Sequence, residues 1–149
     1  MVEVTPATQS DVSQIVKLAA IIFHYHPQQL LSIEQIRKSA LTWIAKDHKT
    51  LVGFVIFQTT GRITDLILIA THPDWTRQGI ASQLLQTFTN YTNTLHTEKN
   101  SVSFLTFQTR LSNIPMQKFG LKYGFENIST RIGFYDDPKE DGLIFLRRV

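Results

Sequence analysis

The sequence predicts a single α/β domain, and two observations support this fold class. Segments in which apolar residues recur with a period of two alternate with segments in which they recur at helical spacing. The 149 residues suit one domain and are enough to bury a substantial core. The chain has no repeat, linker or low-complexity segment, so we expect one domain over residues 1–149.

The N-terminal part is expected to contain a strand, two helices and a hairpin. Residues 2–8 have the alternation of a short strand. Asp11 is predicted to cap a first helix, because apolar residues then follow on one helical face. Ser32 is predicted to open a second helix, whose inner stripe reaches Trp43. Residues 47–50 lie between two apolar runs and indicate a hairpin turn.

The remaining elements centre on residues 63–71, a strand that is apolar on both faces and therefore belongs in the middle of a sheet. A long amphipathic helix follows, with apolar positions from Ile80 to Tyr91. Further elements are predicted at residues 102–109 (strand), near 112–113 (helix start), 124–134 (strand) and 142–148 (strand).

Composition excludes several classes of function. There is no cysteine, which excludes disulfides, thiolate metal sites and a cysteine acyl-enzyme. The net charge of +3 fits an anionic small ligand at least as well as nucleic acid, and no Lys/Arg run favours the latter. Apolar runs such as Leu66–Ala70 are too short to cross a bilayer, and the N-terminus lacks a signal pattern. We therefore expect a cytoplasmic protein with no membrane partner and no nucleic-acid partner.

The turn between the central strand and the long helix has the character of an anion site. The first amides of a helix have no intrahelical partner and lie at the positive end of its dipole. Gly79 would let the backbone approach a phosphate, and Ala81 would keep the next turn clear. Neither G-x-x-x-x-G-K-[ST] nor G-x-G-x-x-G occurs. The alternative is a plain strand–turn–helix with an incidental glycine.

Three segments in order resemble the GNAT superfamily of acetyltransferases. "ATHPDWTRQGIASQLL" is similar to its acetyl-CoA loop, R/Q-x-x-G-x-G/A, although Thr76 stands where the family has Arg or Gln. "KTLVGFVIF" is similar to its hairpin strand, and "LSNIPMQKFGLKYGFENI" to its N-x-x-A-x-x-x-Y-x-x-x-G-F segment. The ending, with Phe134–Tyr135 and Glu140–Gly142, is closest in pattern to the ribosomal-protein alanine N-acetyltransferases.

The resemblance implies a fold, a co-substrate and an activity. The implied fold is a mixed, mostly antiparallel central sheet of about six or seven strands with helices on both faces. The implied activity is acetyl transfer from acetyl-CoA, the co-substrate, to a primary amine by direct attack in a ternary complex. The acceptor amine is unidentified, a small molecule or a peptide N-terminus, and a homodimer is left open. The alternative is an acetyl-CoA-binding module that has lost catalysis.

The resemblance also implies a set of cofactor-binding residues. The strand end would pair its backbone with the pantetheine arm, and the loop and first helical turn would hold the pyrophosphate. Asn113 would touch the pantetheine arm, although its other role is a helix N-cap, and Lys122 would lie near the phosphates, although a lone lysine is commonly just solvated. The implied backbone and loop residues are Ile69, Ala70, Thr71, Arg77, Gln78, Gly79, Ile80, Ala81 and Ser82.

The catalytic pattern departs from the family. The usual general acid, the tyrosine of the N-x-x-A-x-x-x-Y segment, is replaced by Gly120, and the strand glutamate of the alanine acetyltransferases is replaced by Gln108. Asp65 matches a strand carboxylate that acts as the base in the histone-acetyltransferase branch, and its apolar neighbours would make it a stronger base. The alternative for Asp65 is a carboxylate that faces water or pairs with Arg62. Tyr123 is a further candidate for the acid, although core packing is its commoner role.

Two polar clusters could line the acceptor pocket. Residues 24–27, His-Tyr-His-Pro, end the first predicted helix, and no further metal-ligand pattern accompanies the two histidines. Residues 136–141 form an acidic turn that could attract an amine, although a solvated turn is the simpler account.

Overall fold

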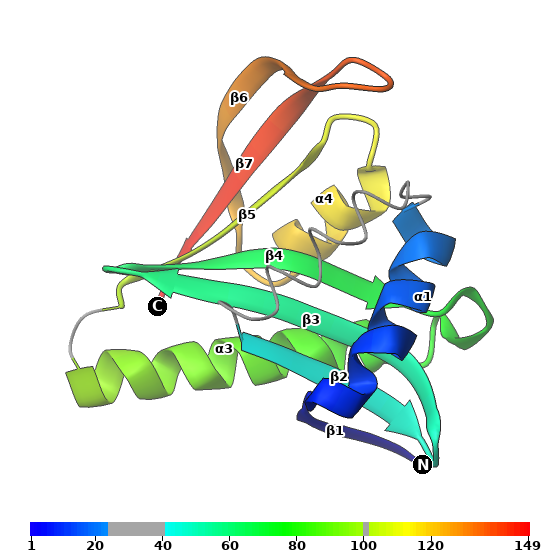
Figure 1. The fold of residues 1–149 in the computed structure, drawn as a ribbon. Helices are drawn as coiled ribbons and strands as arrows, with labels where there is room; N and C mark the ends of the chain where they lie inside the picture. Colours follow the sequence, from blue (N-terminus) through cyan, green and yellow to red (C-terminus); the bar gives the residue numbers. More distant parts are fainter. Residues whose placement is uncertain (24–40, 100–101) are drawn as a thin grey trace. The chain divides into compact units, whose positions relative to one another are not determined.

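The computed structural model describes residues 1–23, 41–99 and 102–149, and for residues 95–99 it describes the backbone alone. Seven strands form one sheet in the order β1-β2-β3-β4-β5-β7-β6 (Figure 1). The pairs β1–β2, β2–β3, β5–β7 and β6–β7 are antiparallel, and β4–β5 is parallel. The expected mixed, mostly antiparallel sheet is confirmed.

The strands and helices follow the predicted order along the described residues. The strands are β1 (Val2–Pro6), β2 (Leu41–Asp47), β3 (Thr50–Thr60), β4 (Ile63–Thr71), β5 (Phe104–Arg110), β6 (Glu126–Tyr135) and β7 (Glu140–Arg148). The helices are η1 (Gln9–Asp11), α1 (Val12–Phe23), η2 (Pro73–Trp75), α3 (Ile80–Lys99) and α4 (Ile114–Lys122), where η1 and η2 are short 3-10 turns.

The chain divides into two compact units. The first unit comprises Met1–Gln58 and Ile67–Tyr91, and the second comprises Thr59–Leu66 and Thr92–Val149. Strand β4 contributes its first residues to the second unit and its last residues to the first.

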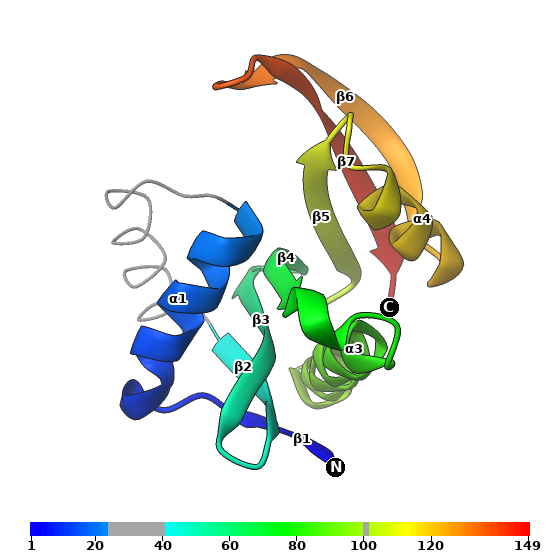
Figure 2. The same ribbon diagram turned by 90° about the vertical axis from the view of Figure 1, so that its right-hand side faces the viewer.

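The first unit has helices on both faces of its strands (Figure 2). Helix α1 packs Ile15, Leu18 and Ala19 against one face. On that face they meet Ile44, Phe54 and Ile56 of β2 and β3. The next residue of β3, Phe57, points to the opposite face, because side chains alternate along a strand. There its ring lies edge-on to Phe88 of α3, with 5.2 Å between the ring centres. The alternation of β3 therefore supplies two separate layers of core.

The core of the second unit is built from three phenylalanines. Phe107 of β5 stacks on Phe145 of β7 with 4.7 Å between ring centres and meets Phe125 edge-on at 5.1 Å. Helix α4, which follows β5 in the chain, packs on this layer through Gly120. This layer fixes where α4 runs relative to β5 and β7 (Figure 1).

Two of the expectations for the N-terminal part are wrong, and one lies outside the described residues. Asp11 is not the N-cap of α1, because it ends the 3-10 turn that precedes the helix. Its carboxylate instead accepts the N–H of Thr8 at 2.8 Å, as in a capping box. Trp43 is not helical, because it lies in β2 opposite Val55 of β3. The helix predicted to open at Ser32 falls within residues 24–40, which the structure does not describe.

Candidate functional site

The turn from β4 into α3 carries the loop singled out in the sequence. The backbone N–H of His72, directly after β4, donates to the carbonyl of Val52 on β3 at 2.8 Å. The 3-10 turn η2 follows, and then two residues adopt left-handed backbone conformations, Arg77 with φ of 63° and Gly79 with φ of 79°. The N–H of Gln83 donates to the carbonyl of Gly79 at 3.0 Å, so Gly79 caps α3.

The backbone conformation of Gly79 favours glycine, because a left-handed φ is strained for any residue with a Cβ atom. Packing within the chain gives no further reason. A Cβ built on it would meet no atom of the described residues within 4 Å, so the space in front of this backbone is open. The amides at the start of α3, from Ile80 onward, precede the first intrahelical hydrogen bond. The loop therefore combines an open approach with the positive end of a 20-residue helix.

The strand end before the loop runs on past its partner. The register of β4 with β5 covers only Ile63–Leu66 of β4, paired with Phe104–Phe107 of β5. Within the described residues, Ile69, Ala70 and Thr71 have no partner on β5. At these three residues β5 does not pair with the backbone of β4. They are the residues predicted to pair with the pantetheine arm of acetyl-CoA. Together with Arg77–Ser82, these residues lie within the first unit.

Asn113 and Lys122 lie in the second unit, at the two ends of α4. The side-chain oxygen of Asn113 accepts the N–H of Met116 at 3.2 Å, so the residue is the N-cap of α4. Lys122 is exposed, and its ammonium lies 5.5 Å from the ring centre of Tyr123. The structural role of Asn113 is therefore shown, while the cofactor contacts of both residues stay predictions.

Asp65 has a specific partner in the second unit. The parallel register of β4 and β5 places Asp65 beside Thr106, and the Thr106 hydroxyl donates to Oδ1 of the half-buried carboxylate. Arg62, the ion-pair partner considered from the sequence, donates instead to the hydroxyl of Ser103 at 2.8 Å. One carboxylate oxygen of Asp65 is thus oriented by Thr106, and its role as a base stays a prediction.

Gly120, where the family has a tyrosine, is a point of close packing. A Cβ built on Gly120 would lie 2.7 Å from Cε2 of Phe107 and still nearer to Cζ. Any side chain at this position would displace the ring that fills the core of the second unit. The Phe107 ring on β5 therefore leaves no room for a tyrosine side chain at position 120 in this packing.

The Gly-Phe pair after Gly120 ends α4. The N–H of Gly124, whose φ is 86°, donates to the carbonyl of Leu121 at 3.1 Å. The N–H of Phe125 donates to the carbonyl of Gly120 at 3.0 Å. This pattern is the Schellman motif, in which a left-handed glycine satisfies the last carbonyls of a helix. Tyr123 is half-buried and packs edge-on against Phe119 with 4.9 Å between ring centres, and its role as general acid stays a prediction.

The acidic turn between β6 and β7 is held by internal hydrogen bonds. Arg110 donates to the carbonyls of Pro138 and Asp136 at 2.9 and 3.0 Å, and it also pairs with Glu140 at 3.3 Å. Hydrogen bonds from Ser112, together with those from Arg110, hold the pKa of the Glu140 carboxyl below its usual range. Asp141 accepts the N–H of Gly133 at 2.7 Å. Two carboxylates of the turn, those of Glu140 and Asp141, therefore already accept hydrogen bonds from other residues of the chain.

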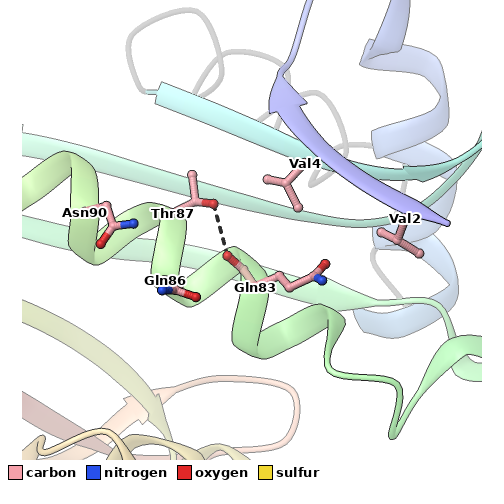
Figure 3. A pocket seen from close by; sticks show the side chains of 6 residues that line it. All are labelled: Val2, Val4, Gln83, Gln86, Thr87 and Asn90. Atoms are coloured by element: carbon pink, nitrogen blue, oxygen red, sulfur yellow. Dashed lines mark hydrogen bonds between the residues drawn. The ribbon is translucent and has the colours of Figure 1, made fainter.

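A groove in the first unit lies apart from the residues of the predicted site. It has a volume of about 310 Å³ and lies between β1 and α3 (Figure 3). It is lined by Val2, Val4, Gln83, Gln86, Thr87 and Asn90, none of which is charged or belongs to the predicted site. Among the described residues, no group of His, Asp and Glu side chains could hold a metal ion. No helix in the described part of the chain is long and apolar enough to span a membrane.

Comparison with known families decides the identity of the fold. The sequence profile of the acetyltransferase (GNAT) domain matches residues 38–127, more than half of the chain. The chain belongs to the GNAT acetyltransferases. No relative of significant sequence similarity is found among curated proteins.

Solved GNAT structures share the fold over the whole chain. The ribosomal-protein-S18-alanine N-acetyltransferase from Escherichia coli has a TM-score of 0.84 at 22% identity, over 100% of this chain and 94% of its own. NAA60 from Arabidopsis thaliana in complex with acetyl-CoA has a TM-score of 0.85 at 15% identity, over 100% and 99%. A GNAT family acetyltransferase from Elizabethkingia anophelis with acetyl-CoA bound has 0.79 at 18%, over 99% and 98%. At these identities the likeness concerns the fold alone.

Three residues that shape the site were missed by sequence reasoning. His72 was read only as part of the loop, although a polar residue directly before Pro73 is a recognisable capping position. Thr106 and Phe107 gave no local signal, because their contacts with Asp65 and Gly120 depend on strand register and helix packing.

Proposed function

We propose that this GNAT chain, as one domain over residues 1–149, transfers the acetyl group of acetyl-CoA to a primary amine by direct attack in a ternary complex. The observation that carries the proposal is the loop from β4 to α3. It combines an open left-handed glycine with the amide-bearing start of a 20-residue helix and a strand edge that β5 does not pair beyond Leu66. The acetyl-CoA complexes of two structural neighbours support the same co-substrate.

The cofactor-binding residues follow from this geometry. The backbone of Ile69, Ala70 and Thr71 would pair with the amides of the pantetheine arm. The amides from Gly79 to Ser82, with the Arg77 side chain and Gln78 beside them, would hold the two charges of the pyrophosphate. Backbone amides supply most of the hydrogen bonds to a phosphate in such a loop. Thr76, where the family has Arg or Gln, should therefore reduce cofactor affinity only a little.

Direct attack is supported by the absence of cysteine from the sequence, which removes the usual acyl-carrying nucleophile. The amine nitrogen would bond to the thioester carbon, the carbon–sulfur bond would break, and the thiolate would leave. One proton must be removed from the attacking ammonium, and one must reach the departing sulfur.

Asp65 is the proposed base. The Thr106 hydroxyl occupies Oδ1 and leaves Oδ2 as the oxygen that accepts the proton, directly or through a water. An aspartate is one methylene shorter than a glutamate, so transfer through water is the expected route. Gly120 provides no acid, and the thiolate then takes its proton from another group or from solvent.

Loss of catalysis is a second candidate function, and two observations favour it. Gly120 has no side chain where the family has a tyrosine, and the Phe107 ring leaves no room there for a Cβ; Gln108, next to Phe107 on β5, cannot accept a proton. Both candidates predict that acetyl-CoA binds. Only the first predicts that free CoA appears when an amine is supplied. A homodimer, a cytoplasmic location and the absence of a nucleic-acid partner stay predictions.

Two measurements test the proposal. Acetyl-CoA at 100 times its dissociation constant should stabilise the fold by about 2.7 kcal/mol, seen as a rise in melting temperature, while adenosine alone should have little effect. No shift at millimolar acetyl-CoA would contradict both candidates. CoA release should then be screened across peptide N-termini, polyamines, amino sugars and aminoglycosides, and release with none of them would favour the binding module.

Asp65→Asn tests the base directly, because it preserves size and removes basicity. Cofactor affinity should stay nearly unchanged, while turnover should fall by roughly 10²–10⁴, with the lower end expected for a base that acts through water. Asp65→Glu is the matched control, since it keeps the carboxylate. Equal turnover of wild type and Asp65→Asn at saturating acetyl-CoA would remove Asp65 from the mechanism.

A further inference from the structure

His72 occupies the junction between β4 and the phosphate loop. Its backbone N–H donates to the carbonyl of Val52 on β3, and its ring nitrogen Nδ1 accepts the N–H of Asp74 at 3.1 Å. Its carbonyl accepts the N–H of Trp75 at 2.8 Å. The residue is therefore the N-cap of η2, and an imidazole takes the place that a Ser, Thr, Asp or Asn oxygen usually has.

The turn that His72 caps determines where the loop goes next. The hydroxyl of Thr76 donates to the carbonyl of Pro73 at 3.2 Å, which closes the turn from its other end. The left-handed residues Arg77 and Gly79 follow at once, and α3 starts at Ile80. Between His72, whose N–H donates to Val52, and the start of α3, the ring nitrogen of His72 thus provides the N-cap of η2.

We propose that His72 is a positioning residue for the pyrophosphate of acetyl-CoA, acting through the hydrogen bond that its Nδ1 accepts from the N–H of Asp74. The inference rests on the proposed function, because it assumes that this loop holds the cofactor. His72 itself need not touch the cofactor. By fixing η2, it holds the amides that follow in the arrangement that a pyrophosphate requires.

The hydrogen bond to Asp74 requires that Nδ1 carry no proton. Protonation would convert the acceptor into a donor and break the bond from the Asp74 N–H. The Asp74 carboxylate, whose Oδ2 lies 3.9 Å from Nδ1, could then attract the imidazolium and pull the turn into another arrangement. The other charged group of the loop is Arg77, and β3 faces the residue with the uncharged Val52 carbonyl. The cap therefore depends on an acceptor atom at position 72, which the side-chain oxygen of an asparagine can also supply.

The test compares three proteins by calorimetric titration with dephospho-CoA. This ligand keeps the pyrophosphate diester, whose charges do not change between pH 5.5 and 8, and lacks the 3′-phosphate, which would titrate. At pH 8, His72→Ala should bind about 2- to 30-fold more weakly than wild type, the equivalent of losing one N-cap. His72→Asn supplies a side-chain oxygen as acceptor and should restore the affinity lost in His72→Ala. Recovery of affinity in His72→Asn but not in His72→Ala is the expected signature of the cap, because both variants lack the imidazole and only asparagine keeps an acceptor.

The possible results separate the inference from the proposed function. No binding by the wild type would overturn both. Wild-type binding with an unchanged affinity in His72→Ala would overturn only the positioning role, as would equal losses in the Ala and Asn variants. A melting curve of each variant, with His72→Ser as a second capping variant, identifies any loss that reflects unfolding.

Discussion

Two glycines of this protein lie in similar settings. Gly79 lies between β4 and the helix α3 that follows it, and Gly120 lies within α4, the helix that follows β5. Their surroundings are opposite. A Cβ on Gly79 would meet nothing within 4 Å, whereas a Cβ on Gly120 would overlap the ring of Phe107. Gly79 has a left-handed backbone, while Gly120 lies inside α4.

The difference shows that one glycine preserves space for something outside the chain and the other lets two elements of the chain touch. Removal of the first should be felt mainly in ligand binding. Removal of the second should be felt mainly in the free energy of unfolding. Variants of the two positions therefore test whether the loop is a binding site and whether α4 is a packing element.

The largest effect is expected for Gly79→Val. A β-branched residue is a severe outlier at this φ, and its methyl groups would fill the open space in front of the amides. Acetyl-CoA affinity should fall by more than about 100-fold, roughly 2.7 kcal/mol. Calorimetric titration of the folded variant measures it. A variant that keeps wild-type affinity would break the comparison, since the open space would then serve no ligand.

Gly120→Ala should destabilise the protein by about 1–3 kcal/mol, because it overpacks the contact with Phe107. Denaturant unfolding measures the loss. Phe107→Leu should itself be destabilising, but the double variant should lose less than the sum of the two single losses, since leucine makes room for the new methyl group. Additive losses would mean that Phe107 is not the reason for the glycine.

Gly79→Ala separates backbone strain from lost space. A left-handed alanine costs about 1–2 kcal/mol of stability, and its methyl group meets no atom of the described chain. We expect a loss of affinity clearly smaller than that of Gly79→Val, measured by the same titration. An alanine as damaging as valine would indicate that strain, and not the open space, controls binding.

The smallest effects are expected at Arg77, the neighbouring left-handed residue. Arg77→Gly should raise stability by up to about 1 kcal/mol, because glycine adopts this φ without steric cost. Arg77→Ala should not, since alanine keeps the strain. Both should weaken acetyl-CoA binding by a similar factor of about 1.4 to 5, the contribution of one exposed charge of 0.2–1 kcal/mol. A larger loss at Arg77 than at Gly79 would contradict the role of the amides.

Sequence reasoning succeeded where the determining interactions are local. The apolar run of β4, the helical spacing from Ile80 and the Asn113 cap of α4 were all predicted at or near their observed positions. It failed at Trp43, because pairing with β3 fixed a strand where apolar spacing also fitted a helix. The contact between Phe107 and Gly120 could not be predicted for a related reason. The contact arises when α4 folds back on β5, and no pattern within either segment encodes it.

The pairing of Ile63–Leu66 with Phe104–Phe107 also constrains the order in which the chain can fold as it is synthesised. The first unit is complete once Tyr91 has been made, whereas Ile63–Leu66, which belongs to the second unit, has no partner until β5 is made. About twenty further residues must be made, roughly 1–4 s at translation rates of 5–20 residues per second. During that interval the segment Ile63–Leu66 exposes unpaired backbone N–H and C=O groups on the edge that β5 later covers, and other unfolded chains can bind such an edge. We therefore expect an isolated fragment of residues 1–99 to aggregate or bind chaperones more readily than the full-length protein.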